Sequence, residues 1–194
     1  MRKKILWIAG IFVVGLMMIV LVGGELFTVH RLDRVVGGLM VLARNAHTAS
    51  ELSKQMRAGS FEKRYRAVVH GCTGDRGEMR DLMYRDMRRK MSFVTDTPAK
   101  GVQEAILNYE TLGRAEGMSL VEIELITGRT HQIRCQFSSR GMPLVGERKY
   151  STLPDDCPIA LWSCYLAFTD PKGERRSFRL EPPSCYPWDL FSKR

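Results

Sequence analysis

The sequence lacks the cysteine pattern of a structural metal site. It has 194 residues and five cysteines, yet no C-x-x-C pair and no accompanying histidine at the spacing of a zinc finger. This absence excludes the common cysteine-based zinc modules. The number of cysteines is odd, and we predict reduced thiols in a reducing compartment, each serving as a small buried hydrophobic side chain.

Internal repeats and low-complexity stretches are also absent, and the length allows one globular domain. Acidic residues are the minority, because 21 Asp and Glu stand against 30 Lys and Arg, which gives a net charge of +9. The basic residues are spread along the chain and would attract polyanions. Nucleic acid is therefore the expected partner, with ribosome binding or an anionic membrane surface as alternatives.

A long apolar run occupies residues 5–22, directly after Arg2, Lys3 and Lys4. At about 1.5 Å per helical residue it is long enough to cross or nearly cross a bilayer. It predicts an N-terminal hydrophobic helix, either a membrane anchor or an uncleaved signal sequence. The basic residues favour a cytoplasmic N-terminus, which would export the remainder. We divide the chain into a hydrophobic segment, residues 1–24, and a folded domain, residues 25–194.

The folded domain alternates between helix and strand patterns. Apolar residues three and four apart predict helices over residues 45–59 and 130–141. Alternating apolar and polar residues predict strands, with shorter strand-like pieces between residues 79 and 100. The predicted strands lie at residues 39–43, 61–71, 103–112, 119–126, 159–169 and 177–180.

Two stretches stand out by their charged residues. Residues 28–45 read TVHRLDRVVGGLMVLARN and place Asp33 between Arg31 and Arg34, ahead of an apolar run. Nearby cations keep a carboxylate ionised, so acid chemistry is possible there, and an ordinary surface acid in a basic loop is the alternative. Residues 125–150 read LITGRTHQIRCQFSSRGMPLVGERKY.

In this order and at this spacing, the two stretches resemble the RluA-like family of RNA pseudouridine synthases, in which an HRLD segment carries an essential aspartate and a GRTHQIR segment its arginine partner. The resemblance covers about residues 24–194. It implies an α+β fold with a mixed, largely antiparallel sheet and flanking helices. It also implies an isomerase that acts on uridines of ribosomal or transfer RNA in the cytoplasm, with Asp33, Tyr65 and Arg134 as catalytic residues.

Conversion of uridine to pseudouridine gains no atom and involves no redox change, so it requires neither a metal nor an organic cofactor. It needs a nucleophile, a proton acceptor at C5 and a pocket that retains the uracil. By resemblance, Asp33 is the nucleophile and Arg134 keeps it charged; a structural salt bridge or a phosphate contact is the alternative for Arg134. Tyr65 would stack on the uracil, because a phenol with a pKa of about 10 is a poor base at neutral pH. From the strand pattern alone, Tyr65 would be a core tyrosine.

The target uridine must swing out of the RNA helix, which costs on the order of a few kcal/mol. By resemblance, Arg31 would fill the vacated space or pair with a neighbouring base or phosphate. Arg129, His131 and Gln132 are candidates for RNA backbone contacts, because the N-terminus of a helix can receive a phosphate. An ordinary solvent-facing position is the alternative for all four residues.

The sequence departs from the family pattern in several places. The lysine-proline strands that precede HRLD in the family are absent, which would leave a sheet edge uncovered. A membrane-tethered variant, a truncated gene with a mis-assigned or fused start, or a hydrophobic segment packed on that edge would explain the absence, and we favour the second. Val36, Glu147 and Ser151 replace a common serine, aspartate and glycine and predict an altered supporting loop. The alternative function is an inactive remnant that only binds RNA or acts as a membrane-tethered basic module.

Overall fold

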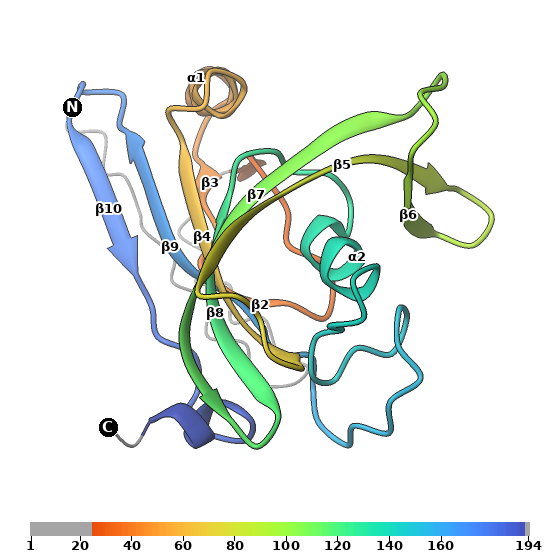
Figure 1. Ribbon diagram of the computed structural model, residues 1–194. Helices are drawn as coiled ribbons and strands as arrows, with labels where there is room; N and C mark the ends of the chain where they lie inside the picture. The colour runs from red at the N-terminus through yellow and green to blue at the C-terminus, as the bar shows by residue number, and fades with distance from the viewer. Residues whose placement is uncertain (1–24, 193–194) are drawn as a thin grey trace.

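The computed structural model describes residues 25–192 (Figure 1). The predicted hydrophobic helix of residues 1–24, and with it the membrane contact through residues 5–22, lies outside the described residues. Among residues 25–192, no helix is long and apolar enough to cross a membrane.

One mixed, largely antiparallel sheet of eight strands organises the described domain and confirms the expected α+β class. Its strand order is β10-β9-β4-β8-β7-β5-β6, and β2 pairs in parallel with β9. A smaller antiparallel sheet joins β1 and β3. The elements are β1 (Phe27–Thr28), β2 (Gly37–Gly38), β3 (Leu42–Ala43), α1 (Ala46–Arg57), β4 (Glu62–His70), β5 (Arg76–Asp86), β6 (Met91–Thr95), β7 (Gln103–Ala115), β8 (Met118–Leu125), α2 (Gln132–Ser138), β9 (Leu161–Thr169), β10 (Arg175–Arg179) and the 3-10 helix η1 (Trp188–Phe191).

The helix α1 lies within the predicted range of residues 45–59. Asn45 caps its N-terminus by accepting a hydrogen bond from the Thr48 amide at 2.8 Å, which satisfies one of the free donors there. Leu52 is buried beside β9, as the three-and-four spacing predicted. Gln55 donates to and accepts from the backbone of Thr169 at 2.8 Å in both directions, which fastens the helix to the sheet.

The region of residues 79–100 is more regular than predicted. It forms the hairpin of β5 and β6, which projects beyond the rest of the sheet in Figure 1, and β5 alone has 11 residues. The prediction of short pieces was wrong because Met79 and Met83 carry the buried face while charged residues fill most of the other positions of β5. Burial of only every fourth residue hides the period-two pattern of a strand.

The apolar run at residues 39–43 enters the core, yet it is not the continuous strand that the sequence predicted. Its side chains at Leu39, Val41 and Ala43 are buried, but only its last two residues form a strand, β3, and β2 ends just before it. The interruption follows from close packing, because Gly38 has a φ of 113° and a Cβ there would lie 2.3 Å from the carbonyl oxygen of Ser163. The chain therefore pairs with β9 for only two residues, as β2, and then leaves this sheet to pair with β1 as β3.

The two faces of the central strands differ in chemistry. On one face, Tyr65, Ala67 and Val69 of β4 pack against Ile133 and Phe137 of α2. On the other face, Arg64 and Arg66 lie beside Glu122 of β8, with charged atoms 3.4 Å and 3.6 Å apart. The helix α2 is thus seated on the apolar face, and its first turn lies where the loop before β2 passes.

His30 holds that loop by its imidazole. Its Nε2 accepts a hydrogen bond from the Val41 amide at 3.1 Å, and its ring meets Phe61 edge-on. Burial, with a smaller contribution from the positive charge of Lys63, lowers the pKa of His30 from 6.5 to about 4. The imidazole is therefore neutral in the folded protein at neutral pH.

We expect the folded domain to lose stability as the pH falls from 6.5 toward 4. In this range the unfolded chain takes up a proton at residue 30 and the folded chain does not, so the free energy of unfolding should fall by about 2 kcal/mol at this residue between pH 7.5 and pH 5. Urea denaturation at the two pH values measures this. His30→Gln should flatten the dependence, and His47→Gln, at an exposed position, should not. Equal slopes in wild type and His30→Gln would contradict the assignment.

Candidate active site

Asp33 lies in the loop between β1 and β2, and two glycines seat this loop on β9. A Cβ at Gly37 would lie 2.4 Å from Cζ3 of Trp162, so only a glycine permits the close approach. The amide of Val36 donates to the carbonyl oxygen of Asp33 at 2.9 Å and closes a tight turn. The side chain of Asp33 is 27% exposed, which leaves it accessible beside the apolar face of the sheet.

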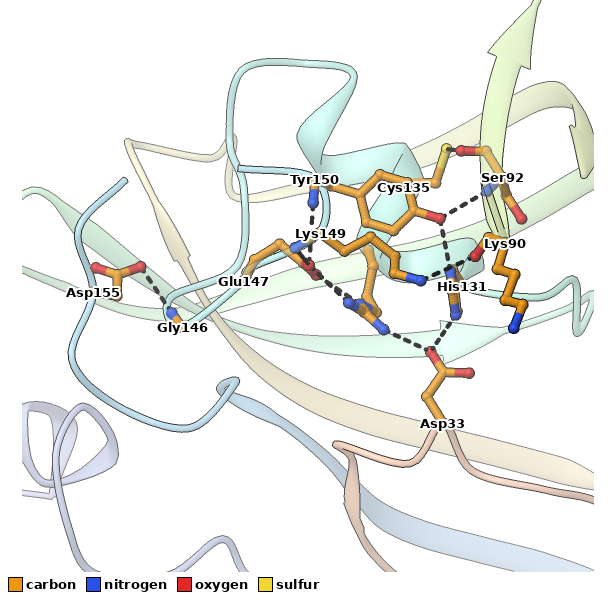
Figure 2. Close-up of polar contacts among 11 residues, drawn as sticks. Asp33, Lys90, Ser92, His131, Cys135, Gly146, Glu147, Lys149, Tyr150 and Asp155 are labelled. Atoms are coloured by element: carbon orange, nitrogen blue, oxygen red, sulfur yellow. Dashed lines mark hydrogen bonds and ion pairs between the residues drawn. The ribbon is translucent and has the colours of Figure 1, made fainter. Parts of the chain in front are cut away.

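Arg134 of α2 is almost fully buried and lies between two carboxylates. Its Nε and Nη2 donate to Glu147 at 2.6 Å and 2.7 Å, a bidentate pair with a carboxylate that has no exposed side-chain surface. Its Nη1 donates to Oδ2 of Asp33 at 3.3 Å. In Figure 2, dashed lines join Glu147 and Asp33 to the side chain that lies between them. The guanidinium therefore joins the loop after α2 to the loop before β2.

The charges in this cluster hold one another ionised. Burial alone would lower the pKa of Arg134, but Glu147 and then Asp33 raise it above its usual value. Burial would raise the pKa of Glu147, but hydrogen bonds from Arg134 and from the backbone amides of Lys149 and Tyr150 lower it. A bidentate, charge-assisted pair satisfies the buried ions well. Arg134 thus presents a permanent positive charge to Asp33.

His131, directly before α2, reaches Asp33 from another side. Its Nε2 lies 3.9 Å from Oδ2 of Asp33, and its Nδ1 lies 2.7 Å from the hydroxyl of Tyr150. The same hydroxyl accepts a hydrogen bond from the Ser92 amide at 2.8 Å. The ring of Tyr150 also lies under the guanidinium of Arg134, whose Cζ is 5.5 Å from the ring centroid. Figure 2 displays these contacts as one connected network.

Tyr65 lies on β4 within the core cluster that includes Ile133 and is bordered by Leu32, the residue before Asp33. Burial raises the pKa of its phenol well above the usual range, and the negative charge of Asp33 raises it further. The phenol therefore stays protonated at neutral pH. It can offer a flat ring and a hydroxyl donor, and it is not a base in this state.

The predicted RNA-binding residues differ in how far they are exposed. Arg31 is exposed beside Asp33, and Arg129 is partly exposed, with its Nε donating to the carbonyl oxygen of Glu104 at 2.8 Å. Gln132 is buried, accepts from the Arg129 amide at 2.9 Å and donates to the carbonyl oxygen of Ile106 at 3.1 Å. The structure therefore brings Asp33, Arg134 and His131 together and turns Gln132 into the protein.

Sequence reasoning missed two members of this network. Glu147 was noticed only as a departure in a supporting loop, and Tyr150 was not considered. The available signal was the VGERKY segment itself, since a glutamate followed by two basic residues, in a loop that comes after the helix carrying Arg134, is a candidate partner for a buried arginine. Among residues 25–192, no group of three or more His, Cys, Asp or Glu side chains is arranged to hold a metal ion.

Comparison with known proteins identifies the family of the chain. The sequence pattern of the RNA pseudouridylate synthase family matches residues 21–139, more than half of the chain. Ribosomal large subunit pseudouridine synthase D of Zymomonas mobilis is 36% identical over 63% of this chain and 38% of its own length. The tRNA pseudouridine synthase C of Pectobacterium carotovorum is 32% identical over 68% of this chain and 38% of its own.

A solved structure extends the likeness to the fold. Human RNA pseudouridylate synthase domain containing 1 superimposes with a TM-score of 0.73 at 20% identity, over 83% of this chain and 71% of that one. The chain belongs to the RNA pseudouridylate synthase family. It spans about half the length of the first curated relatives that it matches.

Glu147→Gln should destabilise the domain by about 3 kcal/mol or more, because it removes the charge that compensates a buried guanidinium. Chemical denaturation followed by circular dichroism measures the change. Glu51→Gln is the matched control, since Glu51 pairs with Lys54 on the surface of α1 and its loss should change stability little. Equal effects of the two substitutions would contradict the role given to Glu147.

Proposed function

We propose that this chain is an isomerase that converts uridine to pseudouridine in ribosomal or transfer RNA, with residues 25–194 as the catalytic domain. The observation that carries the proposal is the accessible carboxylate of Asp33, paired at 3.3 Å with the buried Arg134 and lying beside the core that contains Tyr65. Family membership and the names of the curated relatives support the reaction.

In the proposed reaction an oxygen of Asp33 bonds to C1′ of the target nucleotide as the bond between N1 and C1′ breaks. The freed uracil turns within the site, and C5 then bonds to C1′ as the carboxylate oxygen leaves. The proton on C5 is lost and N1 gains one, so the product is an isomer of the substrate. The carboxylate must be ionised at the beginning of each catalytic cycle to act as a nucleophile. The positive charge of Arg134 favours this state of Asp33.

Tyr65 has a stacking role in this scheme. Its raised pKa argues against a phenolate that removes the C5 proton, because the neutral phenol is the stable form at neutral pH. A rigid aromatic side chain held in the sheet gives the uracil a flat surface while its bond to the sugar is broken. The pocket thereby keeps the base from leaving.

Basic residues around the site supply the RNA contacts. Arg31, two residues before Asp33, is exposed and in this scheme fills the space that the extruded uridine leaves. Arg129 lies at the approach to α2, and the exposed Arg85 and Lys149 belong to the charged groups that act on His131. Together with the net charge of +9, these side chains favour a polyanionic partner.

Asp33→Asn should lower the reaction rate by more than about a thousandfold, because the amide cannot act as the nucleophile. Release of tritium from RNA labelled at C5 of uridine, with RNA that lacks pseudouridine as substrate, measures the rate. Asp96→Asn, at an exposed position in the loop after β6, is the control and should keep the wild-type rate.

The alternative function, RNA binding without catalysis, predicts a different result for wild type and Asp33→Asn. It requires wild-type protein that binds RNA with steep salt dependence, is unaffected by Asp33→Asn and releases no tritium. Such a result would refute the enzymatic proposal.

Arg31→Ala should reduce kcat/KM for RNA by about tenfold or more, since it removes the side chain that replaces the extruded uridine. The free energy of unfolding should stay near the wild-type value, because Arg31 is exposed. Arg57→Ala, on an exposed position at the end of α1, removes an equal charge away from the site and serves as the control. Equal losses in both variants would mean that Arg31 contributes only to the overall charge.

A further inference from the structure

Two side-chain nitrogens approach a single oxygen of Asp33. Nη1 of Arg134 lies 3.3 Å and Nε2 of His131 lies 3.9 Å from the same atom, Oδ2. In Figure 2 both dashed lines end on this oxygen, while the other carboxylate oxygen points away from them. The two oxygens of the carboxylate are therefore inequivalent, and Oδ1 is the one left open for a reacting atom.

The contact with Tyr150 on one side and the carboxylate of Asp33 on the other together favour one tautomer of His131. Its oxygen already accepts from the Ser92 amide, and its single hydroxyl proton finds an acceptor in Nδ1 of His131 at 2.7 Å. A neutral imidazole that accepts at Nδ1 carries its proton on Nε2. The Nε2–H then faces the carboxylate, which avoids placing a lone pair against a negative charge.

The surroundings keep His131 neutral. Burial lowers its pKa, Asp33 opposes this, and the positive charges of Arg134, Lys149 and Arg85 lower it further. These groups approach from α2, from the loop after it, from β5 and from the loop before β2. Asp33 thus faces one permanent cation and one neutral donor.

The backbone at His131 is also specialised. Its φ of 53° and ψ of 26° place it in the left-handed region, which non-glycine residues rarely adopt. This turn directs the side chain toward Asp33 and leaves it only 13% exposed. An imidazole held this way is poorly placed to serve as an outward phosphate contact.

We propose that His131 is a positioning residue for Asp33, which, as the Nε2–H tautomer set by Tyr150, fixes Oδ2 together with Arg134 and so presents Oδ1 to C1′ of the nucleotide. The inference rests on the proposed function and deepens it. The separation of 3.9 Å is beyond a formed hydrogen bond, and contacts of this kind shorten when substrate closes the site. A neutral donor orients the carboxylate without the loss of nucleophilicity that a second cation would bring.

Two substitutions at residue 131 separate this role from a purely structural one. Asparagine tolerates the left-handed backbone but is too short to place a donor at the Nε2 position, whereas the amide nitrogen of glutamine falls close to it. With C5-labelled RNA lacking pseudouridine and the full chain in excess, His131→Asn should slow single turnover by about tenfold. The enzyme concentration at half-maximal rate should stay within about twofold, and His131→Gln should recover the rate to within about threefold of wild type.

Nitrogen-15 NMR of the histidine side chains gives a readout independent of turnover. Nδ1 of His131, identified by its absence in His131→Asn, should have the chemical shift of an unprotonated nitrogen at pH 7.5, and Nε2 that of a protonated one. Asp33→Asn should lower the pKa of His131, since the carboxylate stabilises the imidazolium. A proton found on Nδ1 would overturn the inference, even if His131→Asn failed to fold.

The outcomes also distinguish this inference from the function on which it rests. If wild-type protein releases no tritium, the proposed function fails and the positioning role fails with it. If wild type is active and Asp33→Asn is not, while His131→Asn matches wild type or both residue-131 variants lose rate equally, the positioning role alone is overturned.

Discussion

The arrangement of the site depends on one buried cation shared between two anions. Arg134 has lost nearly all contact with water, and its ionisation is supported by Glu147, which fills two of its donor positions, and by Asp33, which takes a third. Removal of a charged partner from such a cluster leaves an ion without compensation. The loop that carries Glu147 and the loop that carries Asp33 are therefore held at fixed positions relative to α2. The buried pair of Arg134 and Glu147 thus orients the accessible carboxylate of Asp33.

The fold serves this cluster by bringing together segments that are distant in the chain. Asp33 and Arg134 are 101 residues apart, and their meeting requires that β2 lie on β9 while α2 lies on the apolar face of β4. The glycines of β2 permit the first contact, and Tyr65 with its neighbours on β4 provides the second. Packing of an ordinary apolar core thus fixes the distance between two charged side chains.

The same packing gives each polar residue near Asp33 a different protonation state. Arg134 stays charged, Tyr65 stays protonated because it is buried beside a carboxylate, and His131 is driven toward its neutral form. Environments that separate the ionisation of neighbouring groups are typical of sites where charge is used in chemistry. Glu147 is compatible with this scheme, since its carboxylate spans two guanidinium nitrogens.

The sequence by itself determined the helices α1 and α2 and most strands of the sheet, because these follow from apolar periodicity. Two short motifs indicated Asp33 and Arg134, and the family resemblance that they carry added Tyr65 as a candidate. Only the tertiary structure decided that β5 continues as one long strand, that Gln132 turns inward, and that Glu147 and Tyr150 complete the network around Arg134. Periodicity reports on neighbours along the chain. Burial and ionisation depend on residues from distant parts of the chain, and the local sequence pattern does not specify the distances between them.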